Sequence, residues 1–182
     1  AWAHQGSLDR LAEKPVDRQE ALAFPTDDGE PATASVSLSE AWANLEAVAE
    51  RGWADTLGVC NVSRSQLETI LDSGSIPPAV VQIEHHPYKP QTDLIERCHN
   101  NGISVVAYSP LSAPGLLDEP LLAEIGEKYD RSQAGVVLAW NATRGVVPIP
   151  SSTTTDHIVA NAAAVATRLD SADRERIAGL EA

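Results

Sequence analysis

Residues 79–109, AVVQIEHHPYKPQTDLIERCHNNGISVVAYS, carry the pattern that decides the fold. An apolar run at residues 79–84 precedes an amphipathic stretch at residues 91–102, and a second apolar run follows at residues 103–109. Short apolar runs bounded by turn residues are typical of buried strands, and the stretch between them has helical spacing. This order predicts a βαβ unit, in which the two strands are parallel.

The same alternation continues on both sides of this unit. The runs DTLGVCN at residues 55–61 and VVPIP at residues 146–150 predict two more strands, and AWAH at residues 1–4 predicts a strand fragment. Ser39 and Ser132 are predicted N-caps of the helices in which they lie. Apolar spacing and terminal glycines predict further helices over residues 38–52, 63–74, 119–130, 132–145, 154–169 and 170–182.

Strands that alternate with helices in this way predict an α/β fold with a parallel sheet. The pattern leaves two closures open, an open doubly wound sheet and part of a (β/α)8 TIM barrel. No G-x-G-x-x-G follows any of the strands, which gives a dinucleotide-binding Rossmann fold little support. We expect residues 1–182 to form a single domain, with a short strand and a lid loop over residues 1–37 and βα repeats plus a C-terminal helix over residues 38–182.

Composition and charge exclude several classes of protein. The net charge of −13 argues against nucleic acid or an anionic membrane surface as a partner. No apolar window is long enough for a transmembrane helix, and the first ten residues lack the features of a signal peptide. Cys60 and Cys98 have neither metal-site spacing nor a disulfide framework. We therefore expect a soluble, cytoplasmic protein without a metal site.

The polar residues of the chain gather where the predicted strands end. These ends read AHQG at residues 3–6, CN at 60–61, EHHPY at 84–88, YSPL at 108–111 and IPSSTT at 149–154. In both closures of a parallel α/β sheet, binding and catalysis take place at the carboxyl ends of the strands. The candidate site is therefore expected there.

Five segments, in this order, resemble the aldo-keto reductase family. They are AFPTDDG at residues 23–29, GVCNVSRSQLETIL at 58–71, QIEHHPY at 82–88, VVAYSPL at 105–111 and VPIPSSTTTDHIVAN at 147–161. The resemblance covers about residues 24–182 and implies a partial (β/α)8 barrel, roughly strands 4 to 8. It also implies an oxidoreductase that uses NAD(P)H to reduce a small-molecule carbonyl substrate, an aldehyde or a ketone.

The resemblance further implies roles for residues at the strand ends. Asn61 and Gln82 would hold the nicotinamide carboxamide, since an amide side chain offers both a donor and an acceptor. Tyr108 would stack on the nicotinamide ring, and Ser109 and Leu111 would lie along the pyrophosphate. The residues that would meet the adenosine half are Ser152, Thr153, Thr154 and Asn161, close to a helix N-terminus that favours phosphate.

Three positions of this cofactor site depart from the family pattern. The serine before the asparagine is Cys60, the adenosine-site lysine is Ser151 and the arginine is His157. In the family those two cations meet the 2′-phosphate of NADPH, and charge-assisted hydrogen bonds of this kind are strong. The replacements favour NADH, or no nucleotide, over NADPH.

The family's catalytic tyrosine, lysine and aspartate have no match in these residues, and the chain resembles the family from about the fourth strand onward. His4 takes the place of the family's catalytic histidine. The candidate catalytic residues are therefore His4, Glu84 and His86. Glu84 is expected inside the barrel without the family's lysine, hence either paired by a missing segment or protonated. His86 has the alternative role of a structural histidine at the rim, and alternation puts His85 on the opposite face.

Two hypotheses about function follow. In the first, the protein is a reductase and these residues are its second half, which agrees with the absence of any methionine. In the second, the chain is a shortened, non-redox relative, an isomerase, a cyclase or a binding protein, that reuses the pocket. Half a barrel leaves two sheet edges open, so the second hypothesis also predicts a homo-oligomer or a partner chain.

Overall fold

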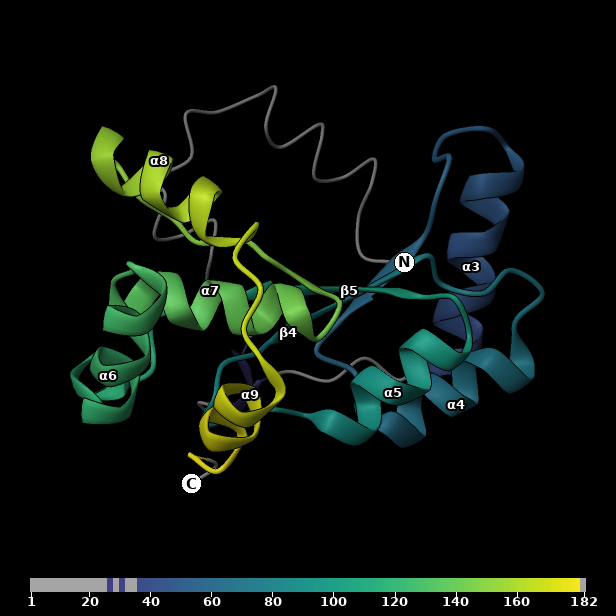
Figure 1. Cartoon of the computed structure of the whole chain (residues 1–182). Coiled ribbons are helices and arrows are strands. Elements are labelled where there is room, and N and C mark those ends of the chain that lie inside the picture. The colour runs from purple at the N-terminus through teal and green to yellow at the C-terminus, as the bar shows by residue number, and fades with distance from the viewer. Residues whose placement is uncertain (1–25, 28–29, 32–35, 181–182) are drawn as a thin grey trace. The chain divides into compact units, whose positions relative to one another are not determined.

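The computed structural model describes residues 26–27, 30–31 and 36–180 (Figure 1). These residues form two compact units, one with the described residues up to 55 together with 68–77, and the other with residues 56–67 and 78–180. The predicted strand at residues 1–4 and most of the predicted lid loop lie outside the described residues.

In the first unit, two short strands pair antiparallel and one helix is held by a tryptophan and a glutamate. The strands are β1 (Thr26–Asp27) and β2 (Glu30–Pro31), and the helix is α3 (Leu38–Glu50). Trp42 is buried, and its indole N–H donates to the carbonyl of Ile76 at 3.0 Å. Glu46 accepts from the backbone N–H of Ser75 and of Ile76, both at 2.7 Å. These bonds fix the chain after α4 (Arg64–Ser73) against α3.

The predicted N-cap of α3 was wrong by two residues. Ser37, not Ser39, caps the helix, because its hydroxyl accepts from the backbone N–H of Glu40 at 3.2 Å. Ser39 already lies within the helix. The reason is that a cap must precede the first helical residue, so that its side chain can reach a free N–H three positions on.

The second unit is built on a four-stranded parallel sheet. Its strands are β3 (Gly58–Cys60), β4 (Val80–Glu84), β5 (Ser104–Tyr108) and β6 (Val146–Pro148), in the order β3-β4-β5-β6. Each neighbouring pair is parallel, and α5 (Thr92–Asn100) connects β4 to β5. The predicted α/β fold is confirmed, including the βαβ unit at residues 79–109.

The two faces of this sheet differ in exposure. Alternate residues of the strands are buried, and they are Val81, Ile83, Val105, Ala107 and Val146. The register places the other residues on a common second face, where Gln82 lies beside Cys60 and Val106, and Tyr108 lies beside Glu84. All of these are partly or fully exposed. One face of the sheet therefore packs into the core, and the polar face carries the candidate site.

Three further helices and a short 3-10 helix share a core of their own. They are α6 (Pro120–Tyr129), α7 (Gln133–Thr143) and α9 (Ser171–Ala178), with the short helix η1 (Leu116–Asp118). In α7, every residue from 135 to 141 is buried, and Ser132 caps the helix as predicted by accepting from the N–H of Gly135. Buried side chains of these helices form one apolar cluster, which also contains Leu169. In Figure 1, α6 and α7 are green and α9 is yellow.

The helix α8 (Thr155–Ala164) is shorter than predicted. The apolar spacing suggested a helix to residue 169, yet the chain leaves the helix after Ala164. Leu169 can then turn inward and pack against α6 and α7, where it is 5% exposed. Tertiary packing thus overrides local spacing at this end of the helix.

In residues 26–27, 30–31 and 36–180, no helix has the length and apolarity that crossing a bilayer requires. Within the same residues, no three histidine, cysteine or acidic side chains gather closely enough to hold a metal ion.

Candidate functional site

Three neighbouring strands bring an asparagine, a glutamine and a tyrosine to one edge of the sheet. Asn61 follows β3, Gln82 lies on β4 and Tyr108 ends β5. The backbone N–H of Asn61 donates to the carbonyl of Gln82 at 2.9 Å. The hydroxyl of Tyr108 donates to Oδ1 of Asn61, also at 2.9 Å. Because β4 lies between β3 and β5, this bond carries the phenol ring across the end of β4.

Two residues at this edge have left-handed backbone conformations. Asn61 has φ of 55° and Ser109 has φ of 48°. Residues other than glycine adopt such angles rarely, and they cluster where the surrounding structure holds a functional geometry. Asparagine tolerates this region better than most residues. The turn after each strand is therefore fixed, and the Asn61 amide is held on the sheet's exposed face.

Glu84 has a cation within this chain, and the expectation that it lacks one was wrong. Lys89 Nζ lies 2.7 Å from Glu84 Oε2, and the Glu84 side chain is 34% exposed rather than buried. The hydrogen bond from Lys89 lowers the pKa of Glu84, and burial only partly opposes this effect. Glu84 is therefore ionised at neutral pH, which rules out the protonated form as its resting state.

His86 lies beside Glu84, as the alternation of the strand predicts. Its Nε2 is 3.4 Å from Glu84 Oε1, and its backbone carbonyl accepts from the N–H of Lys89 at 2.8 Å. The residue is 5% exposed, and its ring stands edge-on to Tyr88. Its Nδ1 has no hydrogen-bond partner among the described residues. The histidine thus joins the Glu84–Lys89 pair at the rim of the sheet.

His85 has a structural environment on the opposite face. It is fully buried, and its ring stacks on Trp140 with centroids 4.9 Å apart. Nδ1 lies 2.8 Å from Oδ1 of Asn141, whose amide N–H donates to the carbonyl of Val137. Burial lowers the pKa of His85 to about 4. The two adjacent histidines therefore lie in different environments, and of the two only His86 faces the candidate site.

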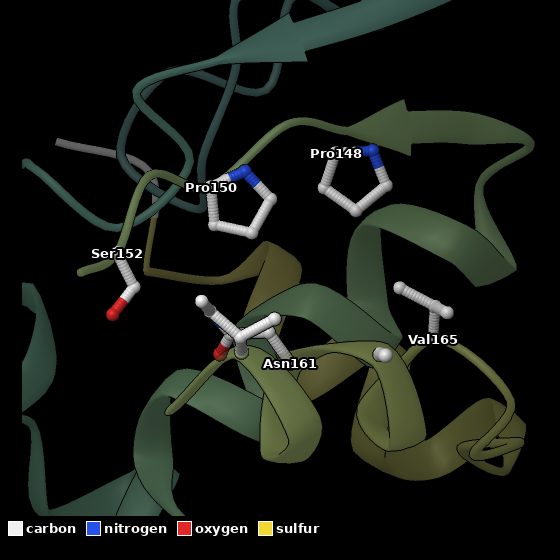
Figure 2. Close-up of a pocket in the computed structure, with 7 residues that line it drawn as sticks. Pro148, Pro150, Ser152, Asn161 and Val165 are labelled. Atoms are coloured by element: carbon white, nitrogen blue, oxygen red, sulfur yellow. The ribbon is translucent and has the colours of Figure 1, made fainter. Parts of the chain in front are cut away.

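A notch of about 310 Å³ lies beyond β6, between the segment that leaves this strand and α8. Figure 2 shows Pro148 at the end of β6 and Pro150 on the segment that follows, with Asn161 of α8 and Val165 across the notch from them. The complete lining is Pro148, Pro150, Ser152, Ile158, Asn161, Ala162 and Val165. The walls are mostly apolar, and two polar groups, the Ser152 hydroxyl and the Asn161 amide, are present to orient a ligand.

Of the predicted adenosine-site residues, Ser152 and Asn161 line this notch. The Ser152 hydroxyl also accepts from the N–H of Thr154, the N-cap residue of α8, at 3.1 Å. The other predicted residues of this segment, Ser151, Thr153, Thr154 and His157, are exposed around the start of α8.

The rest of the predicted site is distributed along the same edge. Cys60 is exposed at the end of β3, and Ser109 follows β5. Leu111 is partly buried and packs on the apolar cluster of α6 and α7, so its side chain supports the loop. His4 lies outside the described residues.

Sequence reasoning missed Lys89 and the apolar walls of the notch. Lys89 is close to Glu84 because the chain turns back after Pro87, so that residues 86 and 89 form an isolated β-bridge. The sequence signal for this contact was Pro87 after the strand, which indicates a turn, with a lysine two residues later. Pro148 and Pro150 similarly mark the end of β6, because neither proline has an N–H to donate to a neighbouring strand.

Comparison with known proteins identifies the relatives of this chain. Residues 7–182 match the model of the aldo/keto reductase family. The chain belongs to this family. Aldo-keto reductase family 1 member A1 of Cricetulus griseus is 40% identical over 149 residues, which cover 76% of this chain and 46% of the relative. The uncharacterized oxidoreductase YtbE of Bacillus subtilis (strain 168) is 38% identical over 141 residues, 78% of this chain and 50% of that protein.

Solved structures agree with this assignment. An aldo-keto reductase complexed with NADPH has a TM-score of 0.76 and 31% identity, with 83% of this chain and 50% of that chain covered. An aldo/keto reductase from Brucella melitensis has a TM-score of 0.72 and 31% identity, with coverages of 79% and 54%. The chain spans about half the length of these relatives, and its sheet corresponds to about half of their barrel. The predicted partial TIM barrel is thereby confirmed.

Proposed function

We propose that this chain forms the nicotinamide-nucleotide site of an oxidoreductase that reduces an aldehyde or a ketone. The observation that carries the proposal is the grouping of Asn61, directly after β3, Gln82, within β4, and Tyr108, at the end of β5, on three neighbouring strands. Two side-chain amides can hold a carboxamide by complementary hydrogen bonds, and a phenol ring can cover a flat heterocycle. The nicotinamide, when bound, supplies the hydride for reduction.

The notch beyond β6 supports a second contact with the same ligand. Apolar walls suit the faces of a purine, and the Asn161 amide can pair with polar atoms at its edge. Ser109, and the loop that Leu111 anchors, lie between β5 and the 3-10 helix, where the pyrophosphate would pass. The residues present therefore fit a dinucleotide along the carboxyl edge of the sheet.

The charge around α8 favours NADH over NADPH in this proposal. Ser151 is neutral and exposed, and His157 is the only basic side chain in the first turn of the helix. A 2′-phosphate gains most from arginine or lysine, which form charge-assisted hydrogen bonds at every physiological pH. Without such cations, NADPH loses the contacts that would distinguish it from NADH.

The test is a titration of the chain with NADH and NADPH, followed by fluorescence of its four tryptophans and three tyrosines. We expect saturable binding of NADH, weaker binding of NADPH, and loss of affinity in Asn161→Ala. Asn100→Ala is the matched control, because Asn100 is exposed at the end of α5, which leads to the opposite edge of the sheet. If neither nucleotide binds at millimolar concentration, the proposal is wrong.

A second candidate function, proton transfer without hydride transfer, is supported by the Glu84–Lys89–His86 group at the rim. Glu84 is ionised and the His86 imidazole lies beside it, so the group offers a proton acceptor and a neighbouring ring that can pass a proton on, as an isomerase or a cyclase requires. His4 was predicted to complete such a site and stays a prediction. Glu84→Gln separates the candidates, since it would remove proton transfer and leave nucleotide binding intact.

We also propose that, where the half barrel is the whole protein, a second copy or a partner chain covers the β6 side of the exposed face of the sheet, beside the nucleotide site. Parallel sheets are almost always covered on both faces. Here Val147 and Ile149 are 54% and 46% exposed. Apolar side chains at such positions favour association.

A further inference from the structure

The hydrogen bond between Tyr108 and Asn61 engages one lone pair of an acceptor that a carboxamide ligand would need. The phenol hydroxyl donates to Asn61 Oδ1 at 2.9 Å, and the bond lies on the exposed face of the sheet. A primary carboxamide has an NH₂ group, which requires an acceptor of this kind. The structure thus places an internal donor on one of the two side-chain amide acceptors of this site, Asn61 and Gln82.

The backbone of Asn61 is held in place. Its φ is 55°, and its N–H donates to the Gln82 carbonyl. The Tyr108 ring is partly exposed and can rotate about its side-chain torsions. A ligand that needs the Asn61 acceptor can therefore free it through a side-chain movement of Tyr108, with no change in the backbone at Asn61.

The ring of Tyr108 also crosses the end of β4. Asn61 directly follows β3 and Tyr108 ends β5, so the phenol bridges β4, which lies between these two strands. Gln82 and Glu84 lie on β4 on the same face. A flat ligand ring that reaches Asn61 and Gln82 together would meet the tyrosine, even though Oδ1 has a second lone pair.

We propose that Tyr108 is a latch: its hydroxyl closes the carboxamide site through Asn61, and its ring opens to cover the ligand. This inference rests on the proposed nicotinamide site and adds a conformational step to it. Binding must first break one exposed hydrogen bond, so the latch lowers affinity for the ligand. It also keeps the Asn61 amide oriented while the site is empty.

Tyr108→Phe tests the latch, because it removes the hydroxyl and retains the ring. We expect NADH to bind about two- to tenfold more tightly to this variant, the range that one net hydrogen bond represents. Tyr108→Leu, which removes the ring as well, is expected to bind NADH more weakly than the wild type. If the hydroxyl instead orients the ring for binding, Tyr108→Phe would also bind more weakly, and the latch would be refuted.

A second variant isolates the Tyr108–Asn61 bond. Asn61→Gly suits the positive φ and removes the amide. In that background, Tyr108→Phe should leave the affinity for NADH unchanged, because no latch remains to be released. An equal gain from Tyr108→Phe in both backgrounds would assign the effect to something other than this bond.

ADP-ribose serves as the probe that lacks the carboxamide. Its affinity should be the same for the wild type and for Tyr108→Phe. If ADP-ribose and NADH bind but Tyr108→Phe gains nothing for NADH, the latch is wrong and the proposed function stands. If neither probe binds to any variant, the proposed function fails and the latch fails with it.

Discussion

At the scale of single residues, His85 shows how burial decides the chemistry of a side chain. The Asn141 amide N–H donates to the Val137 carbonyl, so Asn141 Oδ1 must accept from His85 Nδ1. This assigns the proton of the neutral ring to Nδ1. Stacking on Trp140 completes an environment in which a charged imidazole is strongly disfavoured.

This environment predicts a loss of stability in mild acid. Above pH 6.5 His85 is neutral whether the chain is folded or unfolded, so it has no effect there. Between pH 6.5 and about 4 the unfolded chain takes up a proton that the folded chain does not, so the free energy of unfolding falls as the pH falls. The loss from this residue reaches at most about 3 kcal/mol. Urea unfolding across this pH range measures it.

His85→Phe keeps an aromatic ring in the stack and removes the titrating group. The variant should be less stable at pH 7, because Asn141 loses its donor, yet its stability should depend less on pH between 6.5 and 4. His157→Phe is the matched control, since His157 is exposed on α8 and should leave the acid dependence as in the wild type. Parallel pH curves for the wild type and His85→Phe would contradict the assignment.

Residue-level prediction from sequence succeeded where it rested on the period of a strand. Alternation placed Gln82, Glu84 and His86 on one face and His85 on the other, because successive side chains of a strand must point in opposite directions. It failed for the partner of Glu84, since Lys89 reaches it only through a turn whose geometry is not encoded in any period.

At the scale of elements, the termini of helices were the least predictable features. The cap of α7 at Ser132 was predicted, because a serine stands directly before an apolar run. For α3 two serines compete, and the structure selects Ser37. The early end of α8 depends on where Leu169 packs, which is a long-range effect. The local sequence therefore predicts the end of a helix correctly only where it offers a single capping residue.

The last helix, α9, is held to α6 by a nearly buried carboxylate. Asp173 Oδ2 accepts from Lys128 Nζ at 2.7 Å and from the hydroxyl of Tyr129 at 2.9 Å. We expect Asp173→Ala to lower the free energy of unfolding by about 1–3 kcal/mol, because it leaves the Tyr129 hydroxyl without this acceptor. Urea unfolding, together with hydrogen exchange of the α9 amides, measures the effect.

Glu124→Gln is the control for this prediction. Glu124 pairs with Arg176 between the same two helices, but its side chain is 65% exposed. Water solvates both partners of such a pair, so the substitution should cost much less than Asp173→Ala. Equal losses for the two variants would show that burial of Asp173 is not what anchors α9.

At the scale of the whole molecule, the order of strands and helices predicted the parallel sheet but not its closure. Each strand and helix has its own apolar period, so the βαβ unit at residues 79–109 can be predicted from the sequence of these residues alone. Whether strands close into a barrel depends on their number and stagger, which no single unit contains. The closure was identified by comparison with solved aldo-keto reductases, in which this chain matches about half of each structure.

The exposed face of this sheet predicts association of the 182-residue chain. Val147 lies on the same face as Gln82 by register, and Ile149 lies two residues further along. Light scattering after size exclusion, in about 0.15 M salt to screen the net charge of −13, should give a mass above 19.3 kDa. Val147→Lys with Ile149→Lys should lower the mass, because two charges on the contact face oppose its burial. Val159→Lys, at an exposed position on α8, should leave it unchanged. A monomer at all concentrations, for wild type and variants alike, would show that this face remains open in solution.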